Sequence, residues 1–419
     1  MEQSYLKRIA DIELSEALES SGAVLIQGPK WCGKTRTAEE HASSALYLQD
    51  IDKNEYYSHI LETRPSKLLE GETPRLIDEW QTAPKLWNGV RFEVDQRAET
   101  GQFILTGSTT PLDVHGLHTG TGRIRRMLMR PMSLFESLES NGSVSLRSLL
   151  DDKDIEGISE LTIENLAFVL ARGGWPISIR DKRTTALRRA YDYVDAVTDV
   201  EISAADGVEK NPLRVRKVMR SLARNVSTTA NLTTIRKDTE GDDIVSDKTL
   251  TSYMNVLRQM FVIEDLQAWS PAIRSKTVIR TSPKRHFVDP SIATALLRLS
   301  PEALLKDFNT FGLLFESLCV RDLRVYAQAL DGEVFHYYDR SGLEADAIVH
   351  LKDGRWGAVE IKMGVKEAEK AAENLIKLKD KIDTDRMQPP SFLMVLTASE
   401  YAYRRKDGVY MVPIGCLRE

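Results

Sequence analysis

Eight consecutive residues near the start of the chain have the types and spacing that bind phosphate groups. They fit the pattern G-x-x-x-x-G-K-[ST] and are Gly28, Pro29, Lys30, Trp31, Cys32, Gly33, Lys34 and Thr35. The glycines let backbone N–H groups curl around phosphate oxygens, and a helix that begins here adds a favourable dipole. We expect Lys34 to reach the β- and γ-phosphates of a nucleotide and the Thr35 hydroxyl to bind Mg²⁺.

This loop needs a strand before it and a helix after it. Residues 23–27 form an apolar run that suits a buried parallel strand, and residues 35–44 favour a helix. The alternative is an ordinary glycine loop, which the two flanking elements disfavour.

Two acidic residues follow the short apolar segment Leu76-Ile77. At a strand end, Asp78 would hold Mg²⁺ through water, and Glu79 would polarise the attacking water. The alternative is an exposed acidic turn, but the phosphate-binding loop upstream favours the catalytic interpretation. Pro74 lies just before the strand, which we therefore expect to be short.

Two further residues are candidates for the same chemistry. The strand at residues 102–108 ends in small polar residues, and beside the acidic strand it would aim Thr106 at the γ-phosphate or the water. Arg123, Arg125 and Arg126 could each neutralise charge in the transition state, and Arg123 is our choice among them. For Arg125 and Arg126 the alternative is a place on the solvated surface.

The last third of the chain predicts the order helix, strand, strand, strand, helix, strand. The strands are expected at about 334–338, 343–351, 355–362 and 392–396, and the second helix at 366–382. Alternation along a strand places Ala345, Ala347 and Val349 on one face and Asp346 on the other. By the same rule Glu360 and Lys362 lie side by side.

Asp346 with Glu360-Ile-Lys362 fits the D…E-x-K arrangement of restriction-endonuclease-like folds, with Glu316 as the helical acid. Such carboxylates bind Mg²⁺, which activates water, while the lysine orients that water. We therefore expect Glu316, Asp346 and Glu360 as metal ligands and Lys362 as a catalytic residue. The alternatives are a solvated charge pair and a degenerate nuclease fold that only binds DNA.

The middle of the chain predicts a winged helix. A basic helix starts near Leu213, a second is capped at Ser246 or Asp247, and strand-like runs follow at 261–266 and 277–280, separated by a loop with Arg274 and Lys276. Winged helices often bind DNA, although many mediate domain packing instead. The basic residues of the first helix are Arg214, Arg216, Lys217, Arg220 and Arg224.

The predicted fold class is therefore α/β with a division into four parts. These are a P-loop NTPase domain (1–135), a helical lid over the nucleotide (136–205), a winged-helix-like domain (206–288) and a restriction-endonuclease-like α/β domain (289–419).

Composition limits the remaining classes. The 419 residues carry a formal net charge of −5, which counts against a protein that coats DNA. No apolar run reaches about 18 residues, so we expect no membrane span. The three cysteines Cys32, Cys319 and Cys416 are too scattered for a disulfide framework or a zinc site, and this favours a cytoplasmic location.

Five segments together resemble one family of prokaryotic AAA-type ATPases over essentially the whole chain. They are residues 28–35, 76–81, 103–108, 122–124 and 130–136. The resemblance implies a P-loop ATPase with a winged-helix and restriction-endonuclease-like C-terminal region, and it implies an adenine nucleotide as the ligand. It supports Lys34 and Thr35 for phosphate and Mg²⁺, Asp78 for Mg²⁺, Glu79 as the base and Thr106 as the sensor.

Two functions follow from these predictions. In the first, ATP gates a metal-dependent domain that cleaves DNA. In the second, the chain is a nucleotide-dependent switch whose C-terminal half binds DNA or protein without catalysis. Many ATPases of this broad class form rings, so a homo-oligomer is a further expectation, and Arg123 would act in cis or in trans.

Overall fold

The computed structural model describes residues 4–108, 120–239, 245–271, 282–383, 385 and 387–419. Their contacts divide the chain into two units. The first is Met1–Pro131 with the segments Ile202–Val208 and Val256–Phe261, and the second is Met132–Glu201, Glu209–Asn255 and Val262–Glu419. Among the described residues, no helix is long and apolar enough to cross a membrane.

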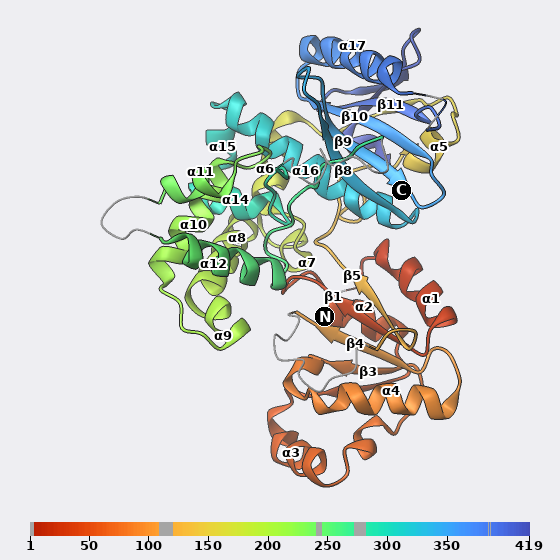
Figure 1. Ribbon diagram of the computed structural model, residues 1–419, viewed down its shortest axis with the longest axis vertical. Helices are drawn as coiled ribbons and strands as arrows, with labels where there is room; N and C mark the ends of the chain where they lie inside the picture. The colour runs from red at the N-terminus through yellow and green to blue at the C-terminus, as the bar shows by residue number, and fades with distance from the viewer. Residues whose placement is uncertain (1–3, 109–119, 240–244, 272–281, 384, 386) are drawn as a thin grey trace. The chain divides into compact units, whose positions relative to one another are not determined.

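The first unit is built on a parallel sheet in the order β2-β3-β4-β1-β5 (Figure 1). The strands are β1 (Ala23–Gln27), β2 (Ser44–Tyr47), β3 (Arg75–Asp78), β4 (Phe103–Gly107) and β5 (Ile124–Leu128). The helices are α1 (Ala10–Ser20), α2 (Lys34–His41), α3 (Asn54–Thr63) and α4 (Lys85–Arg97), with 3₁₀ turns η1 (Ile51–Lys53), η2 (Pro65–Leu69) and η3 (Trp80–Thr82). This confirms the α/β prediction for the N-terminal third.

Alternation along β1 explains the layers of this unit. Val24 and Ile26 pack in the apolar cluster that contains residues of α1 and α2, whereas Leu25 packs in the cluster that contains residues of α4. The sheet is thus covered on both faces, as buried parallel strands require.

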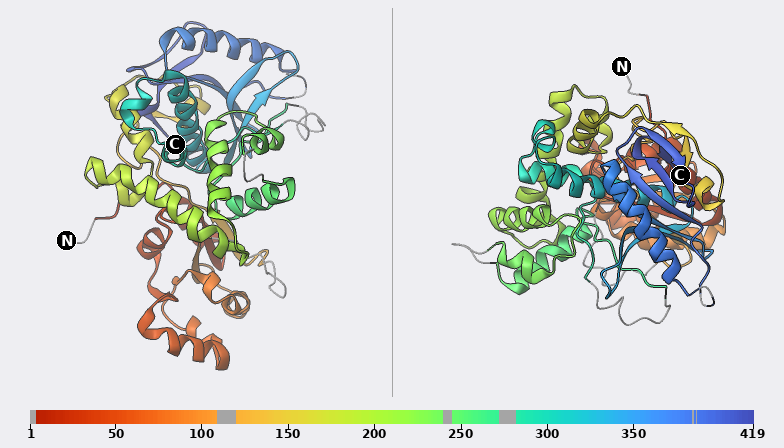
Figure 2. Two further views of the ribbon diagram at one scale, coloured as in Figure 1. Left: turned by 90° about the vertical axis from the view of Figure 1, so that its left-hand side faces the viewer. Right: turned by 90° about the horizontal axis from the view of Figure 1, so that it is seen from above.

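The second unit has a mixed sheet in the order β7-β12-β13-β11-β10-β9-β8 and a separate pair, β14 with β6. The strands are β6 (Val144–Ser145), β7 (Gly157–Ile158), β8 (Gly332–Tyr338), β9 (Glu344–Leu351), β10 (Trp356–Lys362), β11 (Phe392–Thr397), β12 (Tyr401–Arg404), β13 (Tyr410–Pro413) and β14 (Leu417–Arg418). Strands β8 to β11 and helix α17 (Val365–Lys381) begin and end close to the predicted residues. The alanines and leucines of α17 pack on the sheet, and the views in Figure 2 show this helix lying along it.

Strict alternation along β9 is interrupted. The register of β8 against β9 shifts between Phe335 and Tyr337, and Ala345 and Ile348 both join the apolar cluster with α17. Since those two residues differ by three positions, Ala345 does not share a face with Ala347 and Val349 in the simple way that we predicted. A bulge of this kind re-aims a side chain, and Asp346 lies within it.

Of the remaining helices, α16 (Phe308–Gln328) packs on the second sheet, and most of the others pack on one another. The others are α5 (Leu146–Leu150), α6 (Ile163–Arg172), α7 (Pro176–Ile179), α8 (Arg183–Ala196), α10 (Pro212–Arg224), α11 (Leu232–Lys237), α12 (Asp247–Gln259), α14 (Pro290–Leu297) and α15 (Pro301–Leu304), with the turns η4 (Val197–Glu201) and η5 (Ile414–Cys416). The short helix α9 (Ile202–Asp206) groups with the first unit.

Most of the segment that we predicted as a lid, residues 136–201, belongs to the second unit, whereas residues 202–205 group with the first. Strand β6 pairs with β14 and strand β7 with β12, near the C-terminal residues. A buried ionic network adds two links: Asp322 accepts from the Leu134 N–H at 2.9 Å, and Asp289 accepts from the Gly174 N–H at 2.9 Å. Arg321 joins both carboxylates, at 2.9 Å from Asp289 and 2.7 Å from Asp322.

The winged helix stays a prediction, although some of the elements expected for it are present. Helix α12 begins where predicted, the Ser246 hydroxyl caps it by accepting from the Thr249 N–H, and Leu250 and Leu257 are buried. Antiparallel bridges join Ile263 to Phe287 and Leu266 to Lys284. The predicted partner run at 277–280 and the loop with Arg274 and Lys276 lie outside the described residues.

Candidate functional site

The phosphate loop connects β1 to α2 and depends on its two glycines. A Cβ on Gly28 would lie 2.1 Å from the Met129 carbonyl oxygen, so no side chain fits there. Gly33 precedes α2 with φ at 101°, in the left-handed region that glycine tolerates. The α2 N–H groups of the first turn are therefore presented at the end of β1, as an anion site requires.

The other loop residues divide into a buried and an exposed set. Cys32 is buried, and its Sγ donates to the Met129 carbonyl at 3.4 Å. Pro29 is buried, whereas Lys30 and Trp31 are exposed. Lys34 is 5% exposed, and its ammonium donates to the carbonyls of Gly28 at 3.1 Å and Pro29 at 2.9 Å.

The Mg²⁺ residues that we predicted lie together at one edge of the sheet. The hydroxyls of Thr35 and Thr106 each donate to Asp78 Oδ1 at 2.7 Å. Strands β3 and β4 are neighbours, so their carboxyl ends meet beside the start of α2. One carboxylate oxygen and the Thr35 hydroxyl at hydrogen-bond distance are hard oxygen donors that suit Mg²⁺, and these residues therefore fit the metal.

Glu79 is held in an unusual backbone conformation beside these residues. Its φ of 54° is left-handed, and its N–H donates to the Thr106 hydroxyl at 3.1 Å. Its carboxylate accepts from the Gln81 side-chain amide and from the Ser108 hydroxyl, the latter at 3.4 Å. A non-glycine residue in this region is strained by about 1–3 kcal/mol, and such strain clusters at functional sites.

Arg123 is not brought to this edge within one chain. It immediately precedes β5, whose first residue pairs with Ala23, whereas the phosphate loop follows Gln27 at the other end of β1. Four strand residues separate the two edges by about 13 Å. The Arg123 side chain is 47% exposed and pairs with Asp95 at 2.8 Å.

Arg8 is a supporting residue that the sequence did not single out. It is 6% exposed and donates to the Cys32 carbonyl at 2.8 Å and to the Arg130 carbonyl at 2.9 Å. It thus fixes the backbone of the phosphate loop against the segment after β5. Nothing in its neighbourhood along the sequence marks this contact, since its partners are far away in the chain.

The second centre brings together all four residues predicted in the last third of the chain. Lys362 Nζ lies 2.9 Å from Glu360 Oε2 and 2.8 Å from Asp346 Oδ2, which also accepts from the Ile361 N–H at 2.9 Å. The fourth residue, Glu316, comes from α16 and is joined to Asp346 through a lysine that we had not predicted.

That lysine is Lys284, whose backbone forms the antiparallel bridge with Leu266. Its ammonium lies 2.8 Å from Glu316 Oε1 and 3.0 Å from Asp346 Oδ1, and the residue is buried. We name the five residues Lys284, Glu316, Asp346, Glu360 and Lys362 the lysine–carboxylate cluster. Its residues come from segments far apart in the sequence. The residues around Lys284 in the sequence therefore did not indicate that it belongs to this site.

Burial and mutual charge shift the carboxylates of this cluster in opposite directions. Burial, with the nearby Asp346, raises the pKa of Glu360 to about 8 and the pKa of Glu316 to about 7. Burial also acts to raise the pKa of Asp346, but the ammonium groups of Lys284 and Lys362 outweigh it and hold that pKa below its usual value. The same carboxylates keep the pKa of Lys284 above its usual value despite burial.

Among the described residues, no group of three or more His, Cys, Asp or Glu side chains is arranged to hold a metal ion. In the lysine–carboxylate cluster, lysine ammonium groups form ion pairs with the carboxylate oxygens that we had expected to bind Mg²⁺. As arranged, this cluster does not fit a divalent cation, in contrast to Thr35 and Asp78.

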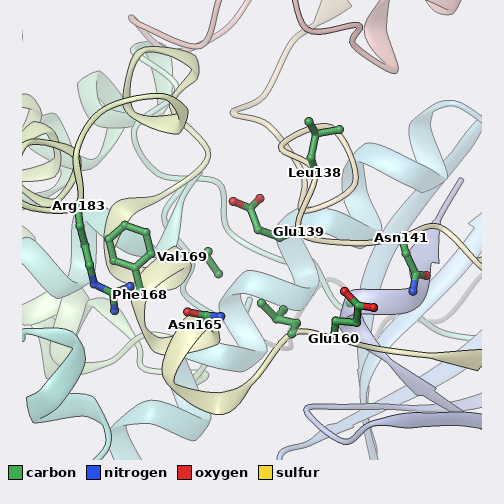
Figure 3. A pocket seen from close by; sticks show the side chains of 10 residues that line it. Leu138, Glu139, Asn141, Glu160, Asn165, Phe168, Val169 and Arg183 are labelled. Atoms are coloured by element: carbon green, nitrogen blue, oxygen red, sulfur yellow. The ribbon is translucent and has the colours of Figure 1, made fainter.

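A cavity of about 500 Å³ in the second unit contains none of the predicted site residues (Figure 3). The Arg183 guanidinium lies 3.9 Å from the centre of the Phe168 ring, and Figure 3 places this pair across the cavity from Asn141 and Glu160. The cavity is lined by Leu138, Glu139, Asn141, Glu160, Leu161, Asn165, Phe168, Val169, Arg183 and Gly415.

Comparison with protein families assigns a class to the first unit. Residues 20–138 match the family model described as the AAA domain. Together with the parallel sheet and the phosphate loop, this match defines the first unit as a P-loop ATPase domain of the AAA type, which binds nucleotide. Residues 163–303 and 311–417 match two models that are each described as a domain of unknown function. No curated protein matches the chain.

Similar solved structures include three proteins of low sequence identity. The Walker-type ATPase paby2304 of Pyrococcus abyssi is 15% identical with a TM-score of 0.45, over 70% of this chain and 96% of its own. A DNA replication initiation factor is 14% identical with a TM-score of 0.22, over 60% of this chain and 92% of its own. The signal transduction ATPase PH0952 of Pyrococcus horikoshii, which has a tetratricopeptide repeat sensor, is 13% identical with a TM-score of 0.26, over 78% of this chain and 50% of its own.

Proposed function

We propose that this chain binds ATP with Mg²⁺ and hydrolyses it at the edge of the first sheet. The observation that carries the proposal is the meeting of Thr35, Thr106 and Asp78 within hydrogen-bond distance beside the phosphate loop. When bound, Mg²⁺ neutralises charge on the phosphate oxygens.

Some residues of the site would bind the nucleotide, and others would act on the attacking water. The N–H groups of the loop and of the first turn of α2 hold the phosphates, and Lys34 turns from its own loop carbonyls to the phosphate oxygens. Glu79 orients and polarises the attacking water, while Gln81 and Ser108 hold its carboxylate in place. Thr106 senses the γ-phosphate through its bond to Asp78.

The test of this function is Lys34→Ala. Because the ammonium is the loop's only side-chain cation in the buried position, its removal should weaken ATP binding and lower the hydrolysis rate by at least about 100-fold. Phosphate release and binding of a fluorescent ATP analogue measure the two effects. Lys67→Ala, an exposed lysine in the same unit, is the matched control and should change neither. Wild-type rates in Lys34→Ala would rule out this site.

We propose for the C-terminal half a binding role that the nucleotide state controls, with DNA as its partner and without cleavage. Helices α11 and α12, followed by the bridged segments around Ile263 and Phe287, support DNA binding. The exposed side of α12 includes Lys248, Thr251 and Ser252, which suit phosphate contact. Ammonium groups at the lysine–carboxylate cluster support binding over cleavage.

Purified protein with supercoiled plasmid separates binding from cleavage. We expect retained DNA in a filter-binding assay and no nicked or linear product, with or without ATP, in Mg²⁺ or Mn²⁺. Lys362→Ala and Lys34→Ala are run in parallel. Plasmid cleavage by the wild type that disappears in Lys362→Ala would instead establish a nuclease, and dependence on Lys34 would show that ATP controls it.

A further inference from the structure

Lys284 stands between two carboxylates that would otherwise face each other in a buried site. Its ammonium bonds to Glu316 Oε1 at 2.8 Å and to Asp346 Oδ1 at 3.0 Å. Both carboxylate side chains are about as buried as the lysine itself, with exposures of 11% and 5%. A buried carboxylate pair is strongly unfavourable without a counter-ion or a proton, and in this structure the Lys284 ammonium is the counter-ion.

The second oxygen of Asp346 is also fully engaged. Oδ2 accepts from Lys362 Nζ at 2.8 Å and from the Ile361 N–H at 2.9 Å. Both oxygens of the central carboxylate therefore bind a lysine. A divalent ion would have to take lone pairs that the two ammonium groups use, at the shorter distance of about 2.0–2.1 Å that Mg²⁺ demands.

The charge balance of the cluster also disfavours binding of a divalent cation. Two ammonium groups already offset two of the three carboxylates of the cluster. A divalent cation added beside both lysines would leave an excess of positive charge in a buried place. One carboxylate oxygen, Glu360 Oε1, has no hydrogen-bond partner within the part of the chain that the structure describes, and Glu360 is 1% exposed. The cluster therefore retains one unused acceptor that could serve a cation once a lysine is gone.

We infer that Lys284 is the built-in cation of this site and that its ammonium keeps divalent metal out. Withdrawal of the ammonium leaves Glu316, Asp346 and Glu360 with a single counter-charge, Lys362, and so turns the cluster into a divalent-cation site. This inference goes beyond the proposed function, since it concerns neither ATP nor DNA and its test uses neither.

The test is Mn²⁺ binding to the full chain without nucleotide, measured by the loss of the free-ion paramagnetic resonance signal. Lys284→Met keeps an unbranched side chain one heavy atom shorter and removes the ammonium with its charge and its two hydrogen bonds. We expect this variant to bind one more Mn²⁺ per chain than the wild type, with an affinity for the added site at least about tenfold above any wild-type binding there. The extra ion should disappear in Lys284→Met/Asp346→Asn. Mn²⁺ should raise the melting temperature of Lys284→Met and leave that of the double variant unchanged.

Lys352→Met removes an exposed lysine whose ammonium pairs with Asp331 at 2.6 Å, and it should bind Mn²⁺ as the wild type does. If Lys284→Met does not fold, the wild type and Asp346→Asn decide the question alone. A wild-type Mn²⁺ site that Asp346→Asn removes would overturn the inference, and so would a folded Lys284→Met without an added ion. The ATPase rate, measured separately, bears only on the first unit.

Discussion

Replacement of Glu79 by glutamine is expected to lower the turnover number for ATP hydrolysis by about 10²–10⁴-fold while ATP still binds. The amide keeps the size of the side chain but no longer attracts a proton from the attacking water. Gln81 and Ser108 would still hold the side chain, because an amide oxygen also accepts hydrogen bonds. Phosphate release under saturating ATP gives the turnover number, and a fluorescent ATP analogue gives the affinity.

Glu62→Gln is the matched control, because Glu62 is an exposed glutamate of α3 in the same unit. We expect it to hydrolyse ATP as the wild type does. A Glu79→Gln protein that turns over ATP at the wild-type rate would remove Glu79 from the mechanism. Equal loss of binding and hydrolysis would instead indicate that the left-handed backbone at Glu79 had collapsed.

The second large effect that we expect is a loss of folding stability in the second unit when Arg321 is replaced. Arg321→Met should destabilise the second unit by about 3–5 kcal/mol, because it leaves two buried carboxylates without their counter-ion. Burial already raises the pKa of Asp322 to about 6 against the opposing charge of Arg321, so we expect its carboxylate to take up a proton in the variant. The same carboxylates fix the N–H groups of Leu134 and Gly174, which would loosen with them.

Thermal unfolding followed by circular dichroism measures this change. A unit of this size loses about 2 °C in melting temperature per kcal/mol, so the expected fall is on the order of 10 °C. Arg355→Met is the control, since Arg355 is 41% exposed and its ion pairs with Asp353 and Asp151 lie at the surface. Such pairs contribute about 0–1 kcal/mol. Equal shifts in the two variants would show that the buried network adds no more than a surface pair.

Much of the first site could be predicted because its chemistry is local in sequence. Lys34 and Thr35 sit within one loop, and Asp78 and Glu79 are adjacent at a strand end. The position of Arg123 was missed because residues 124–128 had not been predicted as a strand. They form β5, which runs parallel to β1, so its start lies at the end of the sheet opposite the phosphate loop.

The second centre was predictable in its strands and not in its counter-ion. Alternation placed Glu360 beside Lys362, and the element order placed Glu316 on a helix before the strands. Lys284 comes from a segment 62 residues before Asp346, and its contact depends on tertiary packing alone. The shift of register beside Asp346 was equally hidden, because a bulge changes which face a residue takes without changing its type.

The pairing of early and late segments in the second unit has a consequence for the order in which the protein can be made. Val144 pairs with Leu417, and Leu134 depends on Asp322, which the ribosome adds long afterwards. The parallel sheet of the first unit, in contrast, is complete once residue 128 has emerged. We therefore expect the nascent chain to carry the folded parallel sheet of the first unit before the pairing partners of residues 132–201 have been translated. During that interval the backbone N–H and C=O groups of strands β6 and β7 have no pairing partner in the chain. We expect a chaperone to bind at this stage, when these strands could pair with another chain.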